Sequence, residues 1–318
     1  MEPLKIVLCS HEGEEYFDLL NDVPGVTICR CERDEIHLHA ADVDIFYGHP
    51  TAELVESAPK LKWIQAPSAG VEFVATIPAL ANADVMLTNT RGAHGPSIGE
   101  HTMALLLAMT RYIPDSVRQQ DRRVFDRSVL YRLCREVGGM TMGILGFGAL
   151  GRGIAQRALG MDMKVIAVDA QAVDGTGLVD EVWPASRLED LLRESDVVVV
   201  ATPYTAETHH LLNAERLAMM KPDGYLIVVS RGGIVDEDAL VAALKSGHLA
   251  GAAIDVTKPE PPADDSPLWD CPRLLITPHT AGASARKERR VVEIFRDNIL
   301  RFQNGEPLIN LVDKTRGY

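Results

Sequence analysis

The sequence predicts an α/β protein with two doubly wound domains, each built on a parallel sheet that helices cover on both faces. Two observations lead to this prediction. The 318 residues are too many for one ordinary core and suit two domains of about 150 residues each. In addition, short apolar runs alternate with helix-like stretches in two successive series, as expected for strands joined by crossover helices.

The first series opens the chain. Short apolar runs bounded by polar residues, Pro or Gly predict buried strands at Lys5–Cys9, Val43–Tyr47, Trp63–Gln65 and Val85–Thr88. Apolar spacing closer to the helical repeat predicts helices at Glu12–Asn21, Thr51–Ser57 and Val71–Leu80. Because the two kinds of element alternate, we expect one parallel sheet in the N-terminal domain.

A different kind of helix is expected from Ser97 to about Tyr112. Ser97 and Glu100 lie three residues apart and fit a capping box at its start. The run from Met103 to Met109 is apolar nearly all round the helix, so we expect the helix to be buried between domains or between subunits. The same run is far too short to span a bilayer.

The second series starts at Thr141. Its predicted strands are Met142–Leu145, Lys164–Val168, Val197–Ala201, Tyr225–Ser230, Gly251–Asp255 and Leu274–Thr277. Its predicted helices are Ala149–Leu159, Leu188–Glu194, Asn213–Met219 and Asp236–Lys245. Six such strands make a complete dinucleotide-binding sheet. An amphipathic helix at Ala283–Gln303 is expected to return the chain to the first domain, which would comprise residues 1–98 and 285–318, with the second domain at 99–284.

Charge and cysteine content argue against several classes of protein. The formal net charge is −13, from 32 basic and 45 acidic side chains, so we expect neither a nucleic-acid nor a membrane partner. The five cysteines are scattered and odd in number, without the spacing of a disulfide framework or a zinc site, so no metal is expected. The first residues lack the layout of a signal peptide, which favours a cytoplasmic location.

A glycine-rich segment lies between the first strand and the first helix of the second series: Gly146-Phe147-Gly148-Ala149-Leu150-Gly151. Its first glycine permits a tight turn, its second lets the backbone approach a pyrophosphate, and its third lets helix and strand pack closely. Asp169 ends the next strand, where a carboxylate accepts hydrogen bonds from the adenosine ribose and disfavours a 2′-phosphate. No Arg follows it, so we predict a Rossmann domain that binds NAD rather than NADP.

Three further motifs stand at the carboxyl ends of predicted strands, where open parallel sheets place their ligands. They are Ser230-Arg231-Gly232-Gly233, Asp255-Val256-Thr257-Lys258-Pro259-Glu260-Pro261 and Thr277-Pro278-His279-Thr280-Ala281-Gly282. With these motifs in this order, the chain closely resembles the D-isomer-specific 2-hydroxyacid dehydrogenase family over nearly its whole length. The resemblance implies a discontinuous, flavodoxin-like substrate domain, an NAD-binding Rossmann domain and a homodimer.

The resemblance also implies roles for three residues. Arg231 would bind the carboxylate and carbonyl of the substrate, His279 would be the acid/base, and Glu260 would hydrogen-bond His279. The chemistry agrees, since reduction of a ketone by hydride builds negative charge on oxygen and calls for a proton donor that works near neutral pH. Arginine offers a rigid two-pronged donor to a planar carboxylate, which lysine does not match.

Further site residues follow from the same resemblance. The amides of Ala69 and Gly70, in a loop with Ser68, would hold the substrate carboxylate. Arg91 would contact the substrate or cap a turn, and His49 would line the pocket. On the cofactor side, contacts are implied for Thr202, Pro203, Ser230, Asp255 and His279.

The implied reaction interconverts a small 2-keto acid and its D-2-hydroxy acid, with glyoxylate or hydroxypyruvate as the expected kind of substrate. Ser230 and Thr257-Lys258 depart from the family pattern and leave the substrate open, whereas Glu260 replaces the Gln of formate dehydrogenases. One alternative is a phosphoglycerate dehydrogenase, although its substrate would require more basic residues than the acidic first domain offers. Another is an NAD-sensing, corepressor-like protein that binds the cofactor and turns over poorly.

Overall fold

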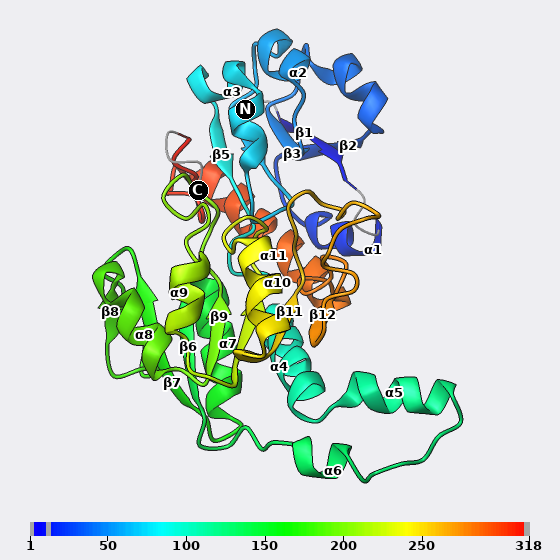
Figure 1. The fold of residues 1–318 in the computed structure, drawn as a ribbon. Helices are drawn as coiled ribbons and strands as arrows, with labels where there is room; N and C mark the ends of the chain where they lie inside the picture. The colour runs from blue at the N-terminus through cyan, green and yellow to red at the C-terminus, as the bar shows by residue number, and fades with distance from the viewer. Residues whose placement is uncertain (1–2, 11–13, 315–318) are drawn as a thin grey trace. The chain divides into compact units, whose positions relative to one another are not determined.

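The computed structural model describes residues 3–10 and 14–314. Its contacts define a first unit, Met1–His94 with Ser284–Tyr318, and a second unit, Gly95–Ala283 (Figure 1). The first boundary falls before the expected residue 98, because helix α4 (Gly95–Thr110) packs against helix α7 (Ala149–Leu159) and belongs wholly to the second unit.

The first unit contains a five-stranded parallel sheet. Its strands are β1 (Leu4–Cys9), β2 (Val26–Arg30), β3 (Ile45–Gly48), β4 (Trp63–Gln65) and β5 (Met86–Thr88). They lie in the order β2-β1-β3-β4-β5, which is the flavodoxin-like order. Four of them agree with the sequence prediction. The prediction omitted β2, a strand at the edge of the sheet that is exposed or half-buried along its whole length and therefore lacks an apolar run.

Short helices surround this sheet, and two expectations need correction. The elements are α1 (Glu14–Phe17), α2 (Ala52–Ser57), α3 (Pro78–Asn82) and 3-10 helices at Asp18–Leu20, Arg33–His39 and Glu72–Thr76. The helix expected at Val71–Leu80 is broken, because Pro78 disfavours helical backbone at Ile77, whose φ is −123° and ψ 83°. Of the helix expected at Glu12–Asn21, Glu12 and Gly13 lie outside the described residues, and the rest forms α1 and a 3-10 turn.

The long C-terminal helix, α11 (Ala285–Asn304), belongs to the first unit. Ser284 caps its start by accepting a hydrogen bond from the backbone N–H of Lys287. Val291, Phe295 and Ile299 are fully buried and join Tyr47 in one apolar cluster. One face of α11 therefore supplies part of the core of the N-terminal sheet.

The second unit contains a seven-stranded parallel sheet. Its strands are β6 (Thr141–Leu145), β7 (Lys164–Asp169), β8 (Val182–Pro184), β9 (Val197–Val200), β10 (Gly224–Val228), β11 (Leu249–Ile254) and β12 (Leu274–Ile276). From β8 to β12 the spatial order is 3-2-1-4-5-6-7, the dinucleotide-binding order with one strand added. The sheets of the two units confirm the predicted fold class. Prediction missed only β8, three half-exposed residues at an edge.

The remaining helices of the second unit are α5 (Ile113–Asp121), α6 (Leu130–Leu133), α8 (Leu188–Glu194), α9 (Ala214–Met219) and α10 (Glu237–Ser246), with a 3-10 turn at Ala185–Arg187. Four of the predicted helices agree with α7 to α10 within a residue at each end. Figure 1 shows the segment from α5 to α6 running out from the rest of its unit. In the part of the chain that the structure describes, none of the helices combines the length and apolarity needed to cross a membrane.

The predicted capping box at the start of α4 is wrong. The helix begins at Gly95-Pro96, since proline is favoured in a first turn where its missing N–H is not needed. Ser97 therefore lies inside the helix and its hydroxyl donates to the carbonyl of Gly282, while Glu100 pairs with Arg157. Much of α4 is covered by α7, β10 and β11 of its own unit, so its burial does not by itself indicate a partner chain.

Glycines allow α4 and α7 to pack with their backbones close together. A Cβ on Gly99 would lie 2.5 Å from the carbonyl oxygen of Gly153, and one on Gly153 would lie 2.5 Å from the carbonyl oxygen of Gly95. Both neighbours are backbone atoms that cannot turn aside. We therefore expect Gly153→Ala to lower the free energy of unfolding by ~1–3 kcal/mol, measured by urea denaturation. Gly138→Ala is the control, because its Cβ would meet nothing closer than 3.8 Å; equal effects of the two substitutions would contradict the packing argument.

Candidate active site

The glycine-rich loop joins β6 to α7 with a backbone that only glycine supports. Gly146 has φ +95°, and a Cβ there would lie 2.8 Å from the backbone nitrogen of Thr202. A Cβ on Gly151 would run into the carbonyl oxygen of Gly146. The first and third glycines thus hold the turn and the close contact of helix with strand, as the sequence predicts.

The second glycine, Gly148, is different. It has an ordinary φ of −75° as the N-cap of α7, and a Cβ built on it would meet nothing within 4 Å. Space therefore lies directly in front of the loop backbone and the first turn of an eleven-residue helix. This arrangement fits a pyrophosphate, whose charge the helix N-terminus and its free N–H groups would stabilise.

Asp169 lies beside this loop at the end of β7. Its carboxylate accepts hydrogen bonds from the backbone N–H of Phe147, at 2.7 Å, and of Gln171, at 2.9 Å. Arg152, which the sequence prediction did not single out, lies nearby and donates to the carbonyls of Phe147 and Asp174. An anionic and a cationic side chain thus lie around the position expected for the adenosine ribose.

His279 and Glu260 form the hydrogen-bonded pair that the family resemblance implies. Their Nδ1 and Oε1 atoms are 2.6 Å apart, and the side chains are 47% and 43% exposed. The pair comes from two loops, one following β12 and one following β11, two neighbouring strands. Because Glu260 engages Nδ1, the other ring nitrogen of His279 is left to face a reactant.

Asp255 fixes the loop that carries His279. The residue is 2% exposed, and its side chain accepts hydrogen bonds from Thr277, Thr280 and Ala281, while its carbonyl accepts from the N–H of His279. His101 of α4 contacts Thr277 Oγ1 at 3.0 Å and lies 3.6 Å from the Asp255 carboxylate. Asp255 thus organises the loop, in addition to any contact with the cofactor.

Arg231 follows β10, the strand next to β11. It is half-buried, and its Nη1 donates to the carbonyl of Ser230 at 2.8 Å. Ser230 is 4% exposed, and within the described residues its hydroxyl has no hydrogen-bond partner. Arg231, Glu260 and His279 therefore follow three adjacent strands of one sheet, at the carboxyl edge where such sheets bind ligands.

The first unit holds the residues predicted for the substrate carboxylate and the substrate pocket. His49 Nε2 lies 3.2 Å from the hydroxyl of Ser68, which also donates to the carbonyl of Gly70 at 2.6 Å. Asn89 fixes the same loop by donating to the carbonyl of Ala69. The loop from Ser68 to Gly70 is thus held by side chains. Arg91 is exposed, and its backbone N–H donates to the side chain of Asn89.

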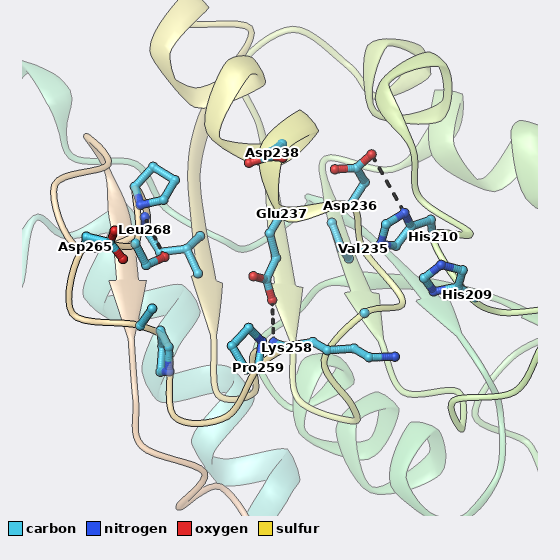
Figure 2. Close-up of a pocket in the computed structure, with 15 residues that line it drawn as sticks. His209, His210, Val235, Asp236, Glu237, Asp238, Lys258, Pro259, Asp265 and Leu268 are labelled. Atoms are coloured by element: carbon cyan, nitrogen blue, oxygen red, sulfur yellow. Dashed lines mark hydrogen bonds and ion pairs between the residues drawn. The ribbon is translucent and has the colours of Figure 1, made fainter.

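A cavity of the second unit lies beside the carboxyl ends of β9, β10 and β11 (Figure 2). It measures about 560 Å³ and is lined by residues such as His210, Asp236, Glu237 and Lys258. Glu237 accepts a hydrogen bond from the backbone of Lys258, and burial raises the pKa of its carboxyl. Arg231, Glu260 and His279 do not line it, so we place the chemistry at the strand ends rather than in this cavity. Among the described residues, no three His, Cys, Asp or Glu side chains gather as they would around a metal ion.

Comparison with known proteins agrees with this geometry. A model of the D-isomer specific 2-hydroxyacid dehydrogenase family, for its NAD binding domain, matches residues 103–281. A glyoxylate reductase of Thermofilum pendens is 34% identical over 265 residues, 83% of this chain and 78% of that protein. A glycerate dehydrogenase of Methylorubrum extorquens is 36% identical over 267 residues, 80% of each chain.

The solved structures agree as well. A D-isomer specific 2-hydroxyacid dehydrogenase of Xanthobacter autotrophicus Py2, in complex with NADPH and MES, is 30% identical with a TM-score of 0.82, covering 98% of this chain and all of that one. The chain therefore belongs to the D-isomer specific 2-hydroxyacid dehydrogenase family. It is a nicotinamide-dependent oxidoreductase.

Proposed function

We propose that the protein uses NADH to reduce a small, unphosphorylated 2-keto acid, of the glyoxylate or hydroxypyruvate kind, to its D-2-hydroxy acid. The observation that carries the proposal is the 2.6 Å contact between His279 and Glu260 on loops next to Arg231. The names of the relatives, glyoxylate reductase and glycerate dehydrogenase, support the same substrate class.

Each residue has one task in this proposal. Arg231 binds the carboxylate and the keto oxygen of the substrate through its planar guanidinium. His279 donates the proton from Nε2 to that oxygen as charge builds on it, and Glu260 holds the ring in place. The amides of Ala69 and Gly70 bind the carboxylate, with Ser68 and His49 beside them. The nicotinamide supplies the hydride when it is bound.

The test of this function is oxidation of NADH by the purified protein with glyoxylate, hydroxypyruvate, pyruvate and 3-phosphohydroxypyruvate. We expect turnover with the unphosphorylated acids. A clear preference for 3-phosphohydroxypyruvate would instead favour the phosphoglycerate dehydrogenase alternative. Tight binding of NADH without turnover of any acid would favour the corepressor-like alternative.

We propose that NAD is preferred over NADP because of Asp169. Its carboxylate, fixed at 2.7 Å from the N–H of Phe147, would repel a 2′-phosphate. Replacing Asp169 by Ser leaves Arg152 as the nearby charged side chain, so we expect kcat/KM with NADPH to rise at least about tenfold relative to NADH, a change of ~1.4 kcal/mol. Steady-state kinetics with both cofactors measure this. Asp180→Asn, at an exposed acid elsewhere in the unit, is the control, and an unchanged cofactor ratio in Asp169→Ser would contradict the assignment.

We propose further that the protein is a homodimer formed through the arm, which we define as residues 113–134. The arm exposes apolar side chains, namely Ile113, Val117, Val124, Phe125, Val129, Tyr131 and Leu133. Phe125 is fully exposed and Tyr131 is 79% exposed, which a second copy of the chain would cover. Light scattering is expected to show a dimer for the wild type and a monomer for the double variant Phe125→Ser/Tyr131→Ser. Leu38→Ser, at an exposed apolar residue of the first unit, should remain dimeric; a monomeric wild type would contradict the proposal.

A cytoplasmic location completes the proposal. All five cysteines are free thiols in the structure. Such thiols persist in a reducing compartment, which supports this location.

A further inference from the structure

A second cavity lies within the first unit, at the carboxyl ends of β1 to β4. It measures about 270 Å³. The residues that line it are Cys9, Ser10, Cys31, Glu32, Arg33, His49, Pro67, Ser68, His94 and Lys287. In the strand order β2-β1-β3, the chain runs from β1 to β2 on one side and then crosses back to β3 on the other side of β1. This reversal makes a switch point of the kind where open sheets bind ligands.

Two cationic side chains and one carboxylate line this cavity. Arg33 and Lys287 bring two positive charges, whereas the chain as a whole carries a net charge of −13. Glu32 is the one carboxylate among the described lining residues. Glu32 and Glu35 form a reciprocal capping box at the start of the 3-10 helix, in which the backbone N–H of Glu32 donates to the carboxylate of Glu35. The carboxylate of Glu32 keeps its negative charge. Lys287 is 15% exposed at the side chain and pairs with Glu288 at 2.8 Å, which fixes its position.

The two thiols add no negative charge to the lining. Cys9 and Cys31 follow paired positions of β1 and β2. Burial raises the pKa of the Cys31 thiol to about 12 and also raises the pKa of the Cys9 thiol. Both therefore remain protonated near neutral pH and add no charge. Because Lys287 shares its charge with Glu288, the guanidinium of Arg33 is the main donor that the lining offers to an anion.

We propose that this cavity is a subsite for a second carboxylate of the substrate, so that the protein also reduces 2-keto diacids of four or five carbons and prefers them to monoacids of the same length. The proposal rests on the function proposed above. Ser68 lines the cavity and also belongs to the loop whose amides bind the first carboxylate. A substrate held at Ala69 and Gly70 can therefore extend its far end into the cavity, towards Arg33 and Lys287. On the carbonyl carbon, glyoxylate carries only a hydrogen and hydroxypyruvate only a hydroxymethyl group. Either group would leave most of the cavity volume to water.

The test compares pairs of substrates with the same number of carbons, of which one member carries a distal anionic group. 2-Oxoglutarate and 2-oxopentanoate have the same carbon chain, and 3-phosphohydroxypyruvate and hydroxypyruvate form a second pair. We expect kcat/KM with NADH to be at least about tenfold higher for 2-oxoglutarate than for 2-oxopentanoate, as one charge-assisted contact would give. In Arg33→Gln and in Lys287→Met this ratio should fall towards one, while 2-oxopentanoate is reduced as in the wild type. Arg289→Gln removes the same charge from α11 at an exposed site paired with Glu293, and should keep the ratio.

Several outcomes would overturn the proposal. Equal kcat/KM values for the five-carbon pair, with glyoxylate or hydroxypyruvate turned over, would remove the subsite and leave the proposed function intact. A preference for 3-phosphohydroxypyruvate over every diacid would assign the cavity to a phosphate instead. If no acid is turned over, the proposed function fails. Calorimetric titration of the NADH-loaded protein with the five-carbon pair then tests whether the cavity binds a distal carboxylate. Tighter binding of 2-oxoglutarate than of 2-oxopentanoate, lost in Arg33→Gln, would then support the subsite, and equal binding would refute it.

Discussion

Replacing His279 by Ala is expected to lower kcat by about a hundred- to ten-thousandfold, the usual contribution of a general acid. Among the described residues, no other histidine that follows a strand at this edge forms a hydrogen bond with a carboxylate, whereas His279 contacts Glu260. No second imidazole is therefore in place to act as the acid. Steady-state reduction of a 2-keto acid by NADH measures the effect, and fluorescence titration of NADH shows whether cofactor binding is retained.

Glu260→Gln provides the matched comparison for His279. The amide can still contact Nδ1 but carries no charge, so we expect a smaller loss of kcat than in His279→Ala. A His279→Ala variant that retains more than about a tenth of wild-type kcat would contradict the assignment of the acid. So would a loss of activity explained wholly by loss of NADH binding.

Replacing Arg231 by Lys is expected to lower kcat/KM by roughly a hundredfold although the charge is kept. An ammonium cannot offer the planar pair of donors that a carboxylate and a neighbouring keto oxygen require. Arg231 is held in position by its contact with the carbonyl of Ser230 at 2.8 Å. The kinetic constants should show a rise in KM together with a fall in kcat, because the guanidinium contacts both the bound group and the reacting one.

Arg216→Lys is the control for this change. Arg216 likewise donates through Nη1 to a backbone carbonyl, that of Leu211, but it belongs to α9 and not to the carboxyl edge of the sheet. We expect wild-type kinetics from this variant. Equal kcat and KM values of Arg231→Lys and the wild type would show that the planar pair of donors of Arg231 is not used.

Most of the fold could be predicted from the sequence because its strands are buried on both faces. Val197–Val200 is fully buried and consists of valine alone, so its apolar run is unmistakable. The edge strands β2 and β8 were missed because a half-exposed strand of three to five residues has no such run. The capping box at Ser97 was wrong because the same spacing of Ser and Glu also occurs inside a helix that begins earlier, at Gly95-Pro96.

The candidate site likewise contains residues that the sequence predicts and contacts that it does not. Arg231, Glu260 and His279 lie in motifs that directly follow strands, so the order of the motifs indicates their meeting at one edge. His101 is a lone histidine in an apolar helix, 176 positions from Thr277, and no local pattern predicts their 3.0 Å contact. Arg33 and Lys287 are likewise far apart in the sequence and line one cavity only because α11 returns to the N-terminal sheet.

The central claim is hydride transfer to a 2-keto acid that gives the D-2-hydroxy acid. The most direct measurement follows the label from NADH dideuterated at nicotinamide C4 into the product of hydroxypyruvate, whose reduction creates a stereocentre, with chiral chromatography and mass spectrometry of the hydroxy acid. We predict the D-isomer carrying deuterium at C2 and a product yield equal to the NADH consumed. Formation of the L-isomer, or oxidation of NADH without a deuterated hydroxy acid, would contradict the proposed function.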